Sequence, residues 1–219
     1  MRIIPCEQGT LEWVTARLGI PTASQFHRII TPRGRLSSQA QAYMNELLAE
    51  RIINQPATAE TSKWMERGKA LESEAADWYA MMASCEPVRV GFCLHDEVNA
   101  GASPDRLIGD DGLLEVKCPT AATHIGYLRS GIGAESDHWV QVQGQLWVTG
   151  RAWADVLSYC PGISPAGFVV RVYASPDATL VGEAVRSFSI ELESAYHDLL
   201  NKVSAEGLGA LGGRDPATA

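Results

Sequence analysis

No apolar run in this 219-residue sequence approaches the roughly 18 residues that a membrane-spanning helix needs. The amino-terminal residues 1–5 also lack the apolar core of a signal peptide. Hydrophobic residues make up 46 % of the chain and charged residues 20 %, close to the averages for globular proteins. These features exclude membrane and fibrous classes, and we expect one folded, soluble domain in the cytoplasm.

Paired cysteines are missing as well. The five cysteines are odd in number, widely scattered and without a Cys-x-x-Cys pair, which argues against a disulfide framework and against a zinc knuckle. The five histidines share no metal-ligand spacing either. We expect the cysteines to be reduced thiols in the core.

The sequence also lacks an excess of positive charge, since it has 18 basic and 26 acidic residues and a net charge of -8. Such a balance argues against a uniformly basic nucleic-acid binder. The charge is uneven, however, since residues 1–40 hold five arginines and two glutamates. Arginine matches the geometry of a phosphate, although a solvated surface is the commoner explanation for such a cluster.

Within this segment, Thr22 and Gln25 have the spacing of a capping box, and Phe26, Ile29 and Ile30 follow at helical spacing. The pattern predicts a helix that begins at Thr22. Its exposed N–H groups, the Ser24 hydroxyl and nearby Arg17 would form an anion site. An ordinary capped helix explains this stretch alone at least as well.

Periodicity predicts the remaining elements and a mixed α/β (α+β) fold. Helices are expected over 62–82, over 139–146 and in a terminal segment whose buried stripe runs through Leu192, Tyr196, Leu199, Leu200 and Val203. Strands are expected over 88–94, 154–159 and 168–173, and residues 204–219 are expected to be a flexible tail.

The block 102–119 carries the chemistry. Asp110, Asp111 and Gly112 form a hairpin turn signal, and Glu115 and Lys117 share one face of the strand that follows. Asp105, at the end of the partner strand, can meet them. Two carboxylates of this kind hold Mg²⁺, which polarises a phosphate and acidifies a water. The lysine then orients or deprotonates that water, or neutralises the charge that develops on the phosphate.

The main-chain carbonyl of Val116 is available as a third metal ligand, and Glu72 on the preceding helix could supply another carboxylate. A surface salt bridge between Glu115 and Lys117 is the alternative, and such pairs are common. The short pattern by itself is therefore weak, and its context must decide.

That context resembles the phage lambda exonuclease family, the YqaJ-like viral recombinase nucleases of the PD-(D/E)xK superfamily. The resemblance rests on five ordered motifs between about residues 6 and 203: RLGIPTAS at 17–24, ERGKALE at 66–72, SPD at 103–105, LEVKCP at 114–119 and QVQ at 141–143. It implies a restriction-endonuclease-like core, a central mixed β-sheet flanked by helices, in a single domain over 1–203.

The resemblance also implies the activity. Family members are 5′-to-3′ exonucleases that digest one strand of double-stranded DNA from a 5′-phosphorylated end and leave 3′ overhangs for a single-strand annealing protein. The implied cofactor is Mg²⁺, two ions per site, with Mn²⁺ able to substitute. A toroidal homotrimer and a phage or prophage origin in a bacterial host are implied as well.

Mapped onto this chain, the resemblance assigns metal binding to Asp105 and Glu115, catalysis to Lys117 and a place near the second metal to Glu72. The group around the terminal phosphate and the approach to the active site then comprises Arg17, Ser24, Ser103 and Gln143.

Three further residues are candidates for DNA contact. Arg33 lies in a Pro-Arg-Gly-Arg loop, and Met65 could act as an apolar wedge between terminal bases. Arg106, directly after the motif aspartate, departs from the lambda pattern and could contact DNA. Two other functions remain open, a structure-dependent endonuclease of the same superfamily and a catalytically silent DNA-end clamp.

Overall fold

The computed structural model describes the backbone of residues 1–56, 63–131 and 137–209, and side chains within 1–56, 70–131 and 138–202. Its centre is a five-stranded sheet in the order β2-β5-β6-β7-β8. The strands are β2 (Val88–Arg89), β5 (Arg106–Ile108), β6 (Gly112–Lys117), β7 (Trp153–Tyr159) and β8 (Gly167–Tyr173). Strands β6 and β7 run parallel and the other neighbours antiparallel, so the expected mixed sheet is confirmed.

A second, three-stranded antiparallel sheet has the order β1-β3-β4. It consists of β1 (Arg2–Ile4), β3 (Phe92–Leu94) and β4 (Gly101–Ala102). Strand β4 leads directly into the segment that carries Asp105, so this small sheet anchors one side of the candidate site.

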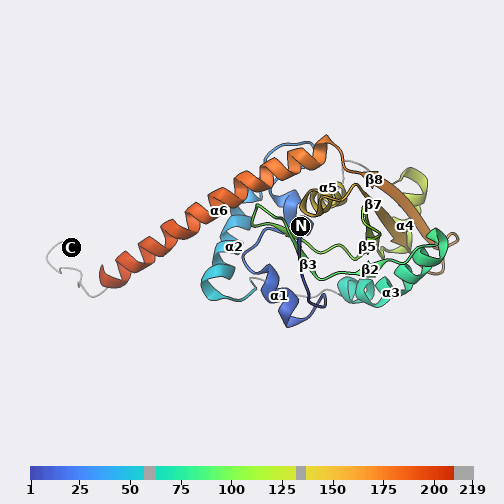
Figure 1. Cartoon of the computed structure of the whole chain (residues 1–219), viewed down its shortest axis with the longest axis horizontal. Helices are drawn as coiled ribbons and strands as arrows, with labels where there is room; N and C mark the ends of the chain where they lie inside the picture. Colours follow the sequence, from blue (N-terminus) through green and yellow to red (C-terminus); the bar gives the residue numbers. More distant parts are fainter. Residues whose placement is uncertain (57–62, 132–136, 210–219) are drawn as a thin grey trace.

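The helices surround the two sheets (Figure 1). They are α1 (Leu11–Arg17), the 3₁₀ helix η1 (Ala23–Arg28), α2 (Ala40–Ile53), α3 (Lys63–Ala83), α4 (Ala121–Ser130), α5 (Asp137–Thr149) and α6 (Pro176–Gly209). The carboxyl-terminal part of α6 extends away from the rest of the molecule. None of the helices in the described ranges is long and apolar enough to cross a membrane.

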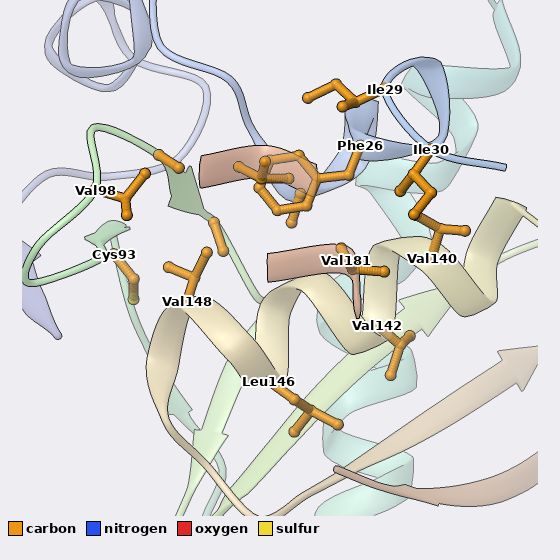
Figure 2. Close-up of a cluster of buried hydrophobic side chains, with 14 of the residues drawn as sticks. Phe26, Ile29, Ile30, Cys93, Val98, Val140, Val142, Leu146, Val148 and Val181 are labelled. Atoms are coloured by element: carbon orange, nitrogen blue, oxygen red, sulfur yellow. The ribbon is translucent and has the colours of Figure 1, made fainter. Parts of the chain in front are cut away.

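Alternating side chains of β6 divide the core into two layers, as the period of a strand requires. Leu113 belongs to a large cluster with side chains of α5 and η1, whereas Leu114 belongs to a second cluster with Ala75 and Tyr79 of α3. Figure 2 shows part of the large cluster, with Phe26 packed above α5. Because Glu115 follows Leu114, its side chain points to the α5 side of the sheet.

The hairpin and most of the long elements are confirmed. Strands β5 and β6 pair antiparallel across the turn at 109–111, and the helices expected over 62–82 and 139–146 are α3 and α5. The strands expected over 154–159 and 168–173 are β7 and β8. Helices α1 and α2 had not been anticipated from the sequence.

The single strand expected over 88–94 is wrong, because β2 and β3 belong to different sheets. The strand is interrupted at Val90 and Gly91. A Cβ atom at Gly91 would collide with the backbone of Ile4 and Cys6. A glycine permits this close backbone approach, and the strand divides there.

The expected helix at Thr22 is also corrected. The segment is a 3₁₀ helix of six residues, and the Thr22 side chain does not cap it. The backbone carbonyl of Thr22 accepts from Gln25 N at 2.8 Å, while its hydroxyl accepts from Arg17. The Thr22 hydroxyl, expected to cap the helix, therefore binds the Arg17 guanidinium instead.

In the terminal helix the buried stripe lies earlier than expected. Val181, Val185, Phe188 and Leu192 are buried, whereas Leu200 is exposed and Tyr196 half-buried. Residues 204–209 continue α6, so this part of the expected tail is helical, and residues 210–219 lie outside the described residues.

The contact between α5 and η1 is close enough to test. Gly144 is buried, and a Cβ atom there would collide with the ring of Phe26, which is itself fully buried. We expect Gly144→Ala to lower the free energy of unfolding by about 1–3 kcal/mol through overpacking. Urea denaturation monitored by circular dichroism measures the change.

Gly126→Ala in α4 is the matched control, because a Cβ atom there has no neighbour within 4 Å. The same substitution should raise stability there by up to about 1 kcal/mol through helix propensity. Equal effects of the two substitutions would contradict the packing of α5 on Phe26.

Candidate active site

Asp105 and the β6 strand come together at the end of the hairpin. Asp105 immediately precedes β5, and its Oδ2 accepts from the backbone N–H of Val116 at 2.6 Å. This bond holds the Asp105 carboxylate next to the strand that carries Glu115 and Lys117. The predicted convergence of these three residues is thus observed.

Glu115 is buried, with 4 % of its surface exposed, and both of its carboxylate oxygens accept hydrogen bonds. Oε1 accepts from Lys117 Nζ at 2.7 Å and from Gln141 Nε2 at 2.7 Å. Oε2 accepts from Gln145 Nε2 at 2.6 Å. A buried carboxylate is stable only with such partners.

Lys117 is held as a cation. Burial by itself lowers the pKa of Lys117, but the charge of Glu115, its hydrogen bond and the charge of Asp105 outweigh burial, so the pKa lies above its ordinary value. Lys117 Nζ also donates to Gln141 Oε1 at 3.0 Å. In this arrangement the lysine supplies positive charge and hydrogen-bond donors rather than a base.

Asp105 is the group that the cluster destabilises. Burial raises the pKa of its carboxyl group well above the usual range, and the negative charges of Glu115 and Glu72 add to this effect. The Val116 N–H and the charge of Lys117 oppose the shift without cancelling it. The ionised Asp105 therefore needs additional positive charge.

Glu72 of α3 reaches the same site in an ion pair. Its Oε1 accepts from Arg106 Nη1 at 2.8 Å, and the Arg106 side chain is 6 % exposed. Arg106 Nη1 also donates to the main-chain oxygen of Asp105 at 2.6 Å. The Arg106 guanidinium is therefore largely buried and paired with Glu72, and DNA contact by Arg106 stays a prediction.

The chemistry of these donors suits a hard divalent cation, since such ions prefer carboxylate and carbonyl oxygens. Asp105 and Glu115 would supply carboxylates, with the main-chain carbonyl of Val116 beside them. Among the described residues, however, no three His, Cys, Asp or Glu side chains are gathered closely enough to hold a metal ion. Glu72 therefore does not complete a carboxylate triad in this structure.

A cleft of about 790 Å³ opens next to these groups. Its lining includes Glu72, Asp105, Arg106, Gln8 and Trp13. Gln8 Nε2 donates to the main-chain oxygens of Val90 and Pro104, which fixes one wall. The cleft gives a substrate access to Asp105.

Trp13 separates this cleft from a second cavity of about 370 Å³, because its side chain lines both. Its Nε1 donates to Ser103 Oγ at 2.9 Å, and the guanidinium of Arg17 lies 3.9 Å from the centre of its ring. Ser103 is two residues from Asp105. The indole therefore joins the arginine segment to the carboxylate cluster.

Arg17 lines the second cavity, and its Nη2 donates to Thr22 Oγ1 at 3.3 Å. Burial lowers the pKa of Arg17, although Tyr43 and Glu50 oppose this effect. The Thr22 hydroxyl in turn lies 3.5 Å from Ser24 Oγ. A guanidinium and the Thr22 hydroxyl at the wall of a cavity, with the Ser24 hydroxyl next to them, are suited to bind an anion.

The structure thus brings Arg17, Ser24 and Ser103 into one connected group, as the resemblance implied. Sequence reasoning did not assign Trp13 to the site. A signal was present, because Trp13 and Arg17 are four residues apart in a helix that Thr10 caps through the Trp13 N–H.

Gln143 is not brought to this group, and its expected position is corrected. The side chain is fully buried, with Nε2 donating to Tyr173 O and Oε1 accepting from Ser175 N. In an α-helix, residues two apart lie on different faces, whereas residues four apart share a face. In α5, Gln141 and Gln145 therefore face Glu115, and Gln143 faces away. Gln145 had not been assigned a role in the site.

The two remaining candidates are a loop arginine and a methionine of α3. Arg33 is exposed in the turn between Ile30 and Leu36, which is closed by the bridge of these two residues. Met65 lies on the backbone of α3, but its side chain is outside the described residues.

Comparison with known proteins points to one family. A family model described as the YqaJ-like viral recombinase domain matches residues 12–152. This match includes Arg17, Glu72, the 103–119 hairpin and the two glutamines of α5 that face Glu115. No curated protein matches the sequence.

Solved structures give a consistent result. The crystal structure of an alkaline exonuclease, LHK-Exo, from Laribacter hongkongensis is similar with a TM-score of 0.81 and 33 % identity, over 90 % of this chain and 99 % of that chain. A structure of LHK-Exo in complex with dAMP gives 0.81 at 32 % identity over the same shares. A phage-related exonuclease from Haemophilus somnus 129PT shares the fold alone, with a TM-score of 0.57 and 14 % identity over 80 % of this chain and 96 % of that one.

The raised pKa of Asp105 makes a prediction about stability. A carboxyl group whose pKa is raised on folding contributes stability below its unfolded pKa of about 3.9, and that stability is lost as the pH rises through the folded pKa. We therefore expect Asp105→Asn to melt at a higher temperature than the parent at pH 8 in the presence of a chelator. The difference should vanish as the pH falls toward 4.

Asp110→Asn, on the exposed hairpin turn, is the control and should leave the melting temperature nearly unchanged. If Asp105→Asn melts at or below the temperature of the parent at pH 8, the carboxylate is not destabilising.

Proposed function

Since the chain belongs to the YqaJ-like viral recombinase family, we propose that it is a metal-dependent exonuclease that digests double-stranded DNA. The observation that carries the proposal is the cluster of buried Glu115 with half-buried Asp105 and Lys117, of which Asp105 lines an open cleft. The similarity to LHK-Exo, a protein named as an alkaline exonuclease, supports the same reaction class. Phosphodiester hydrolysis is the reaction that these groups can perform.

Asp105, Glu115 and the Val116 carbonyl would hold Mg²⁺, and Mn²⁺ has similar ligand preferences. A bound ion supplies positive charge to the reacting phosphate and lowers the pKa of a coordinated water. The raised pKa of Asp105 supports this proposal, because the ionised carboxylate lacks sufficient positive charge in the protein alone.

The side chains around the cluster have separate tasks. Lys117, held as a cation, donates to the oxygen that develops negative charge on the phosphate or leaving group. Gln141 and Gln145 hold the Glu115 carboxylate in one orientation through both of its oxygens. Preorganised groups of this kind lower the cost of reorganisation during the reaction.

The proposed direction of digestion is 5′ to 3′. Arg17, Ser24 and Ser103 form an anion-binding group that Trp13 joins to the catalytic cluster. A terminal 5′-phosphate bound there would place a nearby phosphodiester at Asp105. Repeated hydrolysis then releases mononucleotides and leaves a 3′ overhang.

The proposal extends to the assembly, on the strength of the resemblance to the lambda exonuclease family. We propose a homotrimeric ring around the DNA and a single-strand annealing protein that receives the overhang. One subunit of this length has a radius of gyration of roughly 17 Å. A single subunit is therefore too small to encircle a duplex, and enclosure requires several copies.

The first test of function uses linear duplex DNA with labelled ends. In Mg²⁺ the protein should release mononucleotides from 5′-phosphorylated ends and leave closed circular DNA intact. Asp105→Ala and Lys117→Ala should each slow the release by about a hundredfold or more. Asp198→Ala, on the exposed face of α6, should match the parent.

Two results would replace the proposal. Equal cutting of closed circles identifies an endonuclease, and tight binding of ends without digestion identifies a DNA-end clamp. Undiminished digestion by Asp105→Ala or Lys117→Ala would contradict the assignment of the site.

The second test concerns Arg17. The parent should digest a 5′-phosphorylated duplex faster than a 5′-hydroxyl duplex, and Arg17→Gln should reduce this preference by about tenfold or more, because a charged hydrogen bond to phosphate is lost. Arg186→Gln, which removes an exposed ion pair with Glu97, is the control. An unchanged preference in Arg17→Gln would show that the cavity does not bind the phosphate.

A further inference from the structure

Of the three carboxylates that are candidates for metal binding, Asp105, Glu115 and Glu72, two are already paired with cations. Lys117 pairs with Glu115 at 2.7 Å and Arg106 pairs with Glu72 at 2.8 Å. The Asp105 carboxylate instead accepts a hydrogen bond from the backbone N–H of Val116, at 2.6 Å from its Oδ2. The site therefore differs from a simple cluster of three available acidic ligands.

The pair of Arg106 and Glu72 is well built. The Arg106 side chain is 6 % exposed and that of Glu72 is 29 % exposed. The same guanidinium nitrogen also donates to the Asp105 main-chain oxygen at 2.6 Å, so Arg106 is fixed to the strand as well as to α3. Arginine keeps its charge at every accessible pH, so at neutral pH Glu72 is released only when a competing cation or a rearrangement displaces Arg106.

The geometry agrees with this restraint. Glu72 lines the cleft together with Asp105, yet the described residues contain no group of three carboxylates placed to share one ion. The Glu72 carboxylate lies instead against the guanidinium of Arg106. The arginine thus fixes the position of the Glu72 carboxylate and neutralises its charge.

We propose that Arg106 withholds Glu72 from the metal, so that the site binds one divalent ion tightly through Asp105 and Glu115. A second ion binds weakly, because it must displace Arg106 from Glu72. This inference rests on the proposed metal-dependent function and adds a difference in affinity to the expectation of two ions per site. Arg106 acts here as a positioning residue that sets the metal stoichiometry.

Metal binding can be measured without DNA and without turnover. Mn²⁺ is added to the full-length chain, and free Mn²⁺ is counted by electron paramagnetic resonance while calorimetry gives the affinities. The variants are Arg106→Gln, Glu72→Gln and the double variant. Arg171→Gln is the matched control, because it removes an arginine from the buried carboxylate of Asp155 elsewhere in the sheet.

The parent should bind one Mn²⁺ tightly and a second much more weakly. In Arg106→Gln the dissociation constant of the second ion should fall by at least about tenfold, since a nearby positive charge is removed and Glu72 becomes available. The double variant should lose this gain. Glu72→Gln alone should leave the affinity of the first ion within about twofold of the parent, and Arg171→Gln should bind like the parent.

Three results would overturn the inference. They are two equally tight ions in the parent, a loss of the first ion in Glu72→Gln, and unchanged binding of the second ion in folded Arg106→Gln. If Arg106→Gln does not fold, Glu72→Gln still decides the question. Because the readout is metal binding, failure here is distinct from a failure of the nuclease assay.

Discussion

The burial of the Glu115 carboxylate is the constraint on which the rest of the site depends. A buried negative charge costs several kcal/mol unless hydrogen bonds and an opposite charge compensate it. Lys117, Gln141 and Gln145 provide that compensation from the same strand and from the facing side of α5. The packing of α5 on the sheet and on η1 is therefore also what places the donors, so the core and the site share one helix.

The charge of Asp105, unlike that of Glu115, is not fully compensated by its neighbours. Its half-buried carboxyl group lies near the negative charges of Glu115 and Glu72, which raise its pKa. The hydrogen bond from Val116 and the charge of Lys117 only partly offset this rise. A protein that keeps such a group gives up stability in exchange for a site that favours a cation. The hairpin holds the group in place because β5 and β6 are anchored on both faces by the two core layers. The paired strands thus keep the Asp105 carboxylate near the other negative charges, whereas a loop could move it away from them.

Trp13 and Arg106 extend the site in two directions. Trp13 connects the cluster to Arg17, because its indole donates to Ser103 and stacks on the Arg17 guanidinium. An anion bound at Arg17 and a phosphate bound in the cleft beside Asp105 would therefore be held at a fixed separation. Arg106 connects the cluster to Glu72 and α3. Positive charge is thus concentrated at particular points in an acidic protein, which explains how a net charge of -8 is compatible with a DNA substrate.

Local patterns in the sequence by themselves determined the hairpin, the helices α3 and α5 and the convergence of Asp105, Glu115 and Lys117. A tight turn and the periods of a strand and a helix depend only on neighbouring residues. The tertiary structure alone decided which glutamine of α5 faces Glu115, and so corrected the position of Gln143. It also decided that Arg106 is buried against Glu72 rather than exposed. Helix orientation and ion pairing across 34 residues depend on how separate elements pack, and no local pattern records that packing.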